Sequence, residues 1–168
     1  YQRGYSNTSF SNIVEKAKVQ RGNIYHYFKS KEDILGSVIK EHENDYTALL
    51  AAWDRDYADP KDRLCRYINM VANNRNNLAR YGCPIGTLSA ELGKEPCALT
   101  GLTVPLFDIF RRWLTDQFLQ LGKSEHAPQL ALHLLSQTEG ISMIAHVYGE
   151  PQLVKDELEF IKRWIDEL

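Results

Sequence analysis

Residues 8–28 read TSFSNIVEKAKVQRGNIYHYF, and this stretch decides the fold of the N-terminal part of the chain. Thr8 or Ser9 can cap a short helix, because a hydroxyl accepts a hydrogen bond from a free backbone N–H. Helical spacing then predicts a buried face made of Phe10, Ile13, Val14 and Ala17. After a break at residues 18–19, a second short helix has its own inward residues, Val19, Ile24 and Phe28. Two short helices joined by a tight turn predict a helix-turn-helix unit.

The outward face of the second helix is polar and consists of Gln20, Arg21, Asn23, Tyr25 and His26. In a helix-turn-helix unit the second helix enters the major groove of DNA. Arginine pairs with guanine edges and asparagine with adenine, whereas tyrosine and histidine reach phosphate oxygens. This face lacks the carboxylates that an enzyme site would need, and it therefore indicates nucleic-acid binding. We expect Tyr27 to pack against the protein instead, as Phe28 does.

Beyond residue 30 the hydrophobic period stays near 3.6 residues, which predicts an all-α fold. Proline and glycine mark where the expected helices begin and end. These helices run from Ser30 to Trp53, Pro60 to Gly82, Pro84 to Gly93, Leu106 to Gly122, Pro128 to Gly149 and Pro151 to Leu168. The short linkers between them are typical of compact helical bundles.

The expected helix over 128–148 is apolar on more than one face, since Leu132 and Met143 lie outside its main stripe. The last helix similarly places Phe160 beside its main stripe. Two interpretations fit this pattern. The helix over 128–148 is either the central helix of a bundle, or it is buried both inward and against a second copy of the chain.

Composition excludes several classes of protein. The chain has 168 residues, of which 43% are hydrophobic and 25% charged, values typical of a globular protein. It has no run of about 18 apolar residues, so we expect a cytoplasmic protein that makes no membrane contact. Residues 1–40 contain seven Lys and Arg against three acidic residues, whereas residues 41–168 contain 13 against 19. A basic N-terminal segment followed by an acidic remainder favours a polyanionic partner that binds the N-terminal segment.

Sequence motifs for catalysis and metal binding are missing. The segment QLGKSEH contains a GKS triplet, but a phosphate-binding loop requires glycine at position 117, which is Gln117. No HExxH motif occurs, and Cys65, Cys83 and Cys97 form no CxxC pair. We therefore expect no enzymatic activity, no cofactor and no metal site.

The segment GYSNTSFSNIVEKAKVQRGNIYHYFKSKEDILGSVI resembles the DNA-binding domain of the tetracycline-repressor (TetR/AcrR) family of one-component regulators, from about Arg3 to Ile39. The resemblance rests on the G-Y step, the T-S cap, the G-N-I-Y-H-Y-F helix and the K-S-K-E-D-I entry to the next helix. It implies a helix-turn-helix domain over 1–43, with its motif at about 9–28, and a helical ligand-binding and dimerisation domain over 44–168. In the family a further helix precedes the G-Y step, so we expect an amphipathic helix upstream of Tyr1.

The resemblance also implies which residues contact DNA. The base, groove and phosphate contacts would come from Thr8, Ser9, Gln20, Arg21, Gly22, Asn23, Tyr25, His26 and Lys31. The chain departs from the family at two positions. Lys18 stands where the family usually has glycine in the turn, which predicts a left-handed lysine at a cost of roughly 1 kcal/mol. Gln20 stands where a serine or threonine usually caps the recognition helix.

For the rest of the chain the resemblance implies a homodimer formed through residues 128–148 and 151–168. It further implies a repressor that binds a palindromic DNA operator and is released by a small hydrophobic effector. The candidate residues that line the effector pocket are Tyr67, Met70, Phe107, Phe110, Trp113 and Gln137. Aromatic residues at helical spacing are also typical of a plain core, so both interpretations stay open.

The segment GCPIGTLSAEL places Cys83 at the N-cap of a helix begun by Pro84. The helix dipole there is expected to lower the pKa of the thiol and make it reactive. One alternative is therefore a redox- or electrophile-sensing regulator acting through Cys83, as in some members of the family; another is an inert, half-buried cysteine. A helical adaptor that does not bind DNA is a third reading of the whole chain.

Overall fold

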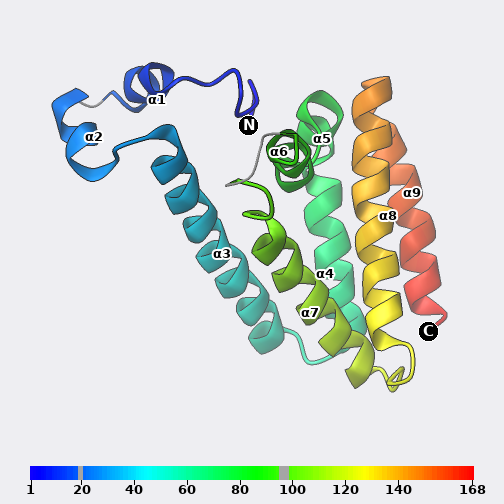
Figure 1. The fold of residues 1–168 in the computed structure, drawn as a ribbon. Coiled ribbons are helices and arrows are strands. Elements are labelled where there is room, and N and C mark those ends of the chain that lie inside the picture. The colour runs from blue at the N-terminus through cyan, green and yellow to red at the C-terminus, as the bar shows by residue number, and fades with distance from the viewer. Residues whose placement is uncertain (19–20, 95–98) are drawn as a thin grey trace.

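The computed structural model describes residues 1–18, 21–94 and 99–168, which form nine helices and no strand (Figure 1). The helices are α1 (Phe10–Ala17), α2 (Arg21–Tyr27), α3 (Lys31–Asp56), α4 (Pro60–Asn73), α5 (Arg75–Tyr81), α6 (Pro84–Leu92), α7 (Val104–Gln120), α8 (Ala127–Tyr148) and α9 (Pro151–Asp166). The predicted all-α fold is confirmed. The short helices α1 and α2 lie at one end of the long helix α3, away from the bundle of α4, α5, α7, α8 and α9 (Figure 1).

Local capping interactions explain where the helices begin. Ser30 accepts a hydrogen bond from the backbone N–H of Asp33 at 3.1 Å, and Asp59 accepts one from Lys61 N–H at 2.9 Å just before Pro60. At the other end of the chain α8 ends at Gly149, whose φ of 68° is the left-handed geometry that glycine adopts without strain. The helix ends marked by proline and glycine therefore match the sequence prediction closely.

One predicted helix is divided in two. The sequence predicts a single helix from Pro60 to Gly82, but the structure interrupts it at Asn74, where φ is −91° and ψ is 4°. Four asparagines stand within residues 73–77, and asparagine side chains compete with the helical backbone for hydrogen bonds. The amide of Asn77 donates to the side chain of Asn74 at 2.8 Å, which stabilises the break.

The core of the bundle forms around α8, which packs against α5, α7 and α9. Its buried residues are small or aliphatic and include Ala131, Leu134 and Ala145, which are fully buried. Small side chains let neighbouring helices approach closely, while Leu64, Leu114 and Phe118 fill the space between them. Helix α8 is thus central in the bundle, but Leu132 and Met143, which lie outside its main stripe, are exposed, so its place in the bundle does not account for them.

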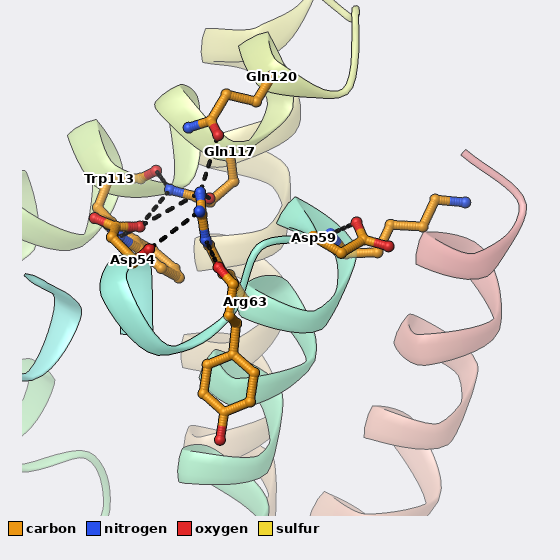
Figure 2. A network of polar contacts seen from close by, with 8 residues as sticks. Asp54, Asp59, Arg63, Trp113, Gln117 and Gln120 are labelled. Atoms are coloured by element: carbon orange, nitrogen blue, oxygen red, sulfur yellow. Dashed lines mark hydrogen bonds and ion pairs between the residues drawn. The ribbon is translucent and has the colours of Figure 1, made fainter. Parts of the chain in front are cut away.

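A polar network ties the corner between α3 and α4 to α7 (Figure 2). Arg63 donates to the carbonyl of Tyr57 at 2.7 Å and to the side chain of Gln117 at 3.1 Å, and it forms a 3.7 Å ion pair with Asp54. The indole N–H of Trp113 donates to both oxygens of the Asp54 carboxylate, at 2.9 and 3.0 Å. The C-terminal end of α3 is thereby anchored to the bundle, while its N-terminal end carries α1 and α2. The expected domain boundary at 43–44 consequently lies inside one continuous helix.

Candidate nucleic-acid interface and internal cavity

Helix α1 is held by a reciprocal cap. The backbone N–H of Asn12 donates to the hydroxyl of Ser9 at 3.1 Å, and the N–H of Ser9 donates to the Asn12 side chain at 3.0 Å. Lys18 ends the helix with φ 55° and ψ 34°, which confirms the left-handed lysine predicted for the turn. Val14 is buried and Ile13 half-buried as predicted. Ala17, however, is exposed, and the prediction that it lies on the buried face is wrong; it is the last residue of α1.

The face of α2 predicted to be polar is exposed. Gly22, Asn23, Tyr25 and His26 all lie on the surface, whereas Ile24 is half-buried. The ring of Tyr25 stacks on Phe10 of α1, with 4.6 Å between ring centroids, so α1 and α2 are packed together. Among the predicted contact residues, Gln20 and the side chain of Arg21 lie outside the described part of the structure.

Tyr27 contradicts the sequence prediction that it packs against the protein. Its side chain is 76% exposed, and its ring has an edge contact with His26, which is itself exposed. Phe28 is half-buried, as expected of the residue that follows the inward-facing Ile24 by one turn. Tyr27 lies at the margin of that inward face, and the described side chains leave it uncovered.

The other predicted DNA contacts already have partners within the chain. The Thr8 hydroxyl donates to the carbonyl of Gly4 at 2.7 Å, and the Ser9 hydroxyl donates to Asn12 at 2.8 Å. The Lys31 ammonium donates to the carbonyl of Tyr5 at 3.0 Å and lies 3.9 Å from the centre of the Tyr5 ring. A phosphate contact through the Thr8 or Ser9 hydroxyl therefore requires an exchange of hydrogen-bond partners, whereas the Lys31 ammonium has three N–H donors and this bond uses one of them.

A cavity of about 240 Å³ lies inside the helical bundle, between α3, α4, α6, α7 and α8. Its lining residues are mainly aromatic and aliphatic: Tyr46, Tyr67, Met70, Val71, Asn74, Leu78, Cys83, Pro84, Ile85, Phe107, Phe110, Leu135, Thr138, Glu139 and Ser142. Two polar pairs join opposite walls. The hydroxyls of Tyr67 and Thr138 are 2.8 Å apart, and the thiol of Cys83 donates to Glu139 Oε1 at 3.1 Å.

Four of the six residues proposed from the sequence for an effector pocket line this cavity, namely Tyr67, Met70, Phe107 and Phe110. Trp113 and Gln137 are not among its lining residues. Trp113 instead belongs to the network of Asp54 and Arg63, since its position in α7 directs the indole toward the α3–α4 corner (Figure 2). Gln137 is half-buried on another face of α8.

The expected lowering of the Cys83 pKa is wrong. Cys83 does cap α6, and its sulfur accepts the N–H of Gly86 at 3.4 Å. Burial, however, disfavours the thiolate, and the neighbouring Glu139 charge disfavours it further, so the pKa of the Cys83 thiol is raised to about 12. Burial also raises the pKa of the Glu139 carboxyl, although the Cys83 thiol opposes this shift.

Sequence reasoning did not single out Glu139 or Tyr46. One signal for Glu139 was available, because it is the only Asp, Glu, Lys or Arg in the whole of α8. Acidic residues are rarely buried unless they are paired. A single acidic residue that faces inward from an otherwise uncharged, apolar helix is therefore a candidate functional residue. Tyr46 comes from α3, and no local pattern connects it with a cavity built mainly by helices later in the chain.

A second cavity, of about 590 Å³, lies between the N-terminal segment, α3 and α6. It shares Tyr46, Asn74, Pro84 and Ile85 with the first cavity. At its edge Glu91 of α6 accepts a hydrogen bond from the backbone N–H of Ser6 at 3.1 Å. Helix α6 therefore contacts the internal cavity at one end and the segment that precedes α1 at the other.

The predicted dimer region presents apolar side chains to solvent. On α8 and α9 these exposed residues are Leu132, Met143, Ile144, Val147, Tyr148 and Phe160. Within the described ranges, no three metal-ligating side chains come together, and no helix is long and apolar enough to cross a membrane.

Comparisons with known proteins agree with this arrangement. Residues 1–38 match the family described as bacterial regulatory proteins, tetR family. The chain is 29% identical over 132 residues to the HTH-type transcriptional repressor NemR of Escherichia coli (strain K12), covering 74% of this chain and 63% of NemR. It is 32% identical over 122 residues to the HTH-type transcriptional repressor DhaR of Mycobacterium sp. (strain GP1), covering 73% of this chain and 55% of DhaR. The chain thus spans less than two thirds of the length of both relatives.

Solved structures share the fold. A TetR transcriptional regulator from Legionella pneumophila superposes with a TM-score of 0.81 at 21% identity, covering 95% of this chain and 87% of that one. The reduced form of E. coli NemR superposes with a TM-score of 0.78 at 22% identity, covering 96% of this chain and 88% of that one.

Proposed function

The chain belongs to the tetR family of bacterial regulatory proteins, and from this premise we propose that it is a DNA-binding transcriptional repressor controlled by a small-molecule effector. The observation that carries the proposal is the exposed polar face of α2, which follows α1 after a left-handed turn. Such a face suits the major groove, where Asn23 would read a base edge and Tyr25 and His26 would contact phosphates.

The active form in this proposal is a homodimer on a palindromic operator. The exposed apolar residues of α8 and α9 support a face that is buried in a dimer, since soluble monomers rarely expose such a patch. Two copies of α2 would then enter successive major grooves about 34–36 Å apart.

The internal cavity is the proposed effector site. An effector would alter DNA affinity if it bound one arrangement of α1 and α2 better than another. Helix α6 offers a physical link, because Cys83 at its beginning lines the cavity and Glu91 near its end holds the backbone of Ser6. Binding in the cavity would therefore release DNA through a shift in the population of these arrangements.

A sensor that reacts through Cys83 is a second candidate, supported by the position of the thiol in the cavity wall. The raised pKa makes this thiol a poor nucleophile in the ligand-free protein. Alkylation of Cys83 followed by a DNA-binding measurement tests this candidate. Unchanged affinity after complete alkylation would exclude it.

Fluorescence anisotropy of the full-length protein with DNA from upstream of its own gene tests the main proposal. The measurement uses two salt concentrations and a scrambled competitor, because phosphate contacts alone are lost at high salt. Arg21→Ala is expected to lose about 1–3 kcal/mol of discrimination at one base pair. Lys31→Ala is expected to weaken binding to all sequences alike and to reduce the salt dependence.

Arg55→Ala is the matched control, since Arg55 is exposed at the opposite end of α3. Tight binding that resists the competitor, with Arg55→Ala unchanged, supports a sequence-specific regulator. Weak binding to both DNAs that disappears at high salt would instead indicate either an operator elsewhere in the genome or an adaptor without sequence-specific DNA binding.

A further inference from the structure

Glu139 is the one acidic residue among the described residues that line the internal cavity, and none of those residues is basic. The carboxylate lies among aromatic rings contributed by three other helices. The ring of Phe110 of α7 contacts the rings of Tyr46 of α3 and Tyr67 of α4, with 4.9 Å and 5.8 Å between the ring centroids. A carboxylate without a basic neighbour, in a lining that includes these rings, is therefore the main electrostatic feature of the cavity.

The two oxygens of Glu139 are placed by α6. Oε1 accepts a hydrogen bond from the Cys83 thiol at 3.1 Å. Oε2 lies against Gly86, so close that a Cβ at that position would come within 2.7 Å of it. Both contacts are at the first turn of α6, the positive end of its dipole, which favours an ionised carboxylate.

The negative charge of Glu139 has no cationic partner within the described residues. None of the ion pairs in the structure includes it, and its only side-chain donor is the neutral Cys83 thiol. Burial without a countercharge raises the pKa of the carboxyl, which means that the ionised form destabilises the folded protein. A residue that lowers stability in this way is typical of a binding site.

We propose that the cavity binds a small organic cation, an amine or quaternary ammonium attached to one ring, with its charge beside Glu139. This inference rests on the proposed function, because it names the class of effector for the same cavity. The cation would supply the missing countercharge in a region of low dielectric, and the rings of Tyr46, Tyr67 and Phe110 would attract it further. The volume of about 240 Å³ is sufficient, since a cavity of about 150 Å³ holds benzene.

Three probes of nearly equal shape test the charge requirement: benzylamine, which is cationic at neutral pH, benzyl alcohol, which is neutral, and benzoate. Their affinities for the full-length protein are measured by ligand-detected NMR titration. We expect benzylamine to bind about tenfold more tightly than benzyl alcohol, because of charge pairing and cation–π attraction. Benzoate should bind most weakly, since its carboxylate is repelled by Glu139.

Two variants assign the preference to Glu139. Glu139→Gln keeps the shape of the side chain but removes its charge, so benzylamine and benzyl alcohol should bind equally. Glu139→Asp retains the charge and should retain a weaker preference for benzylamine. Glu125→Gln is the control, because Glu125 is exposed just before α8 and does not line this cavity. Its preference for benzylamine should equal that of the wild type.

Several outcomes would overturn the inference: equal binding of benzylamine and benzyl alcohol to the wild type, tighter binding of the alcohol, or no binding of any probe. Tighter binding of the alcohol would indicate that a protonated Glu139 donates to a neutral ligand. The anisotropy measurement without probes separates this inference from the proposed regulator. If benzylamine is preferred but the protein does not bind DNA, only the regulatory role fails.

Discussion

Replacing Arg63 by methionine tests whether the polar network at the α3–α4 corner holds the two parts of the chain together (Figure 2). The Arg63 side chain is only 11% exposed and donates four hydrogen bonds. Methionine keeps most of the apolar stem and removes the guanidinium. The expected result is a large loss of stability without a change of fold.

The magnitude follows from the acceptors that the substitution leaves without a donor. The bonds to the Gln120 side chain and the Asp54 carbonyl are exposed, so water replaces the lost donor at little cost. The bonds to the Tyr57 carbonyl and the Gln117 side chain are partly buried. Each such acceptor costs about 1–3 kcal/mol when it is left unpaired, so the two together give a loss of about 2–6 kcal/mol. The ion pair adds little, because Asp54 is well exposed to solvent.

Urea unfolding followed by circular dichroism and tryptophan fluorescence measures this loss as a shift of the midpoint at constant slope. Arg55→Met is the control, since Arg55 is 71% exposed one residue after Asp54 and should change stability by less than about 0.5 kcal/mol. An Arg63→Met variant as stable as this control would refute the reasoning. The corner would then be held by apolar packing alone.

Three further predictions concern the turn, the cavity and the dimer face. Lys18→Gly should stabilise the protein by about 0.5–1 kcal/mol in urea unfolding, because it relieves the positive φ of Lys18, and Lys16→Gly within α1 should destabilise it instead. Glu139→Gln should raise the Tm at pH 8 and change it little at about pH 3.5, below the unfolded-state pKa. Because the folded-state pKa of Glu139 is raised, the wild type loses stability as pH rises from the unfolded value of 4.5 through that pKa, and glutamine does not titrate. Met143→Glu should convert the proposed dimer to monomers in analytical ultracentrifugation, since the residue is 67% exposed in the single chain, whereas a dimer equal to wild type would place the interface elsewhere.

The helix boundaries were predictable because short-range interactions determine them. Ser9, Ser30 and Asp59 act within their own first turns, and the left-handed geometry of Lys18 follows from the turn between two packed helices. The break at Asn74 was missed because the apolar stripe of residues 64–78 continues through it. Periodicity records which face is buried, but it does not record whether the backbone stays helical between buried residues.

The chemistry of the cavity depends on contacts between distant parts of the chain, and Cys83 illustrates why local rules fail there. From the sequence, a helix N-terminus should lower the pKa of the thiol, and the structure does contain that interaction, since Gly86 donates to the sulfur. The dipole effect is about 1 kcal/mol or less, however, whereas burial beside a carboxylate raises the pKa from 9.0 to about 12. Burial is the larger cause, and the charge of Glu139 adds to it from 56 residues away in the sequence and 3.1 Å away in the structure. The carboxylate that adds to the raised pKa of the thiol is also the group on which the proposed cation site depends, so both features rest on contacts between α6 and α8 that no local pattern in the sequence records.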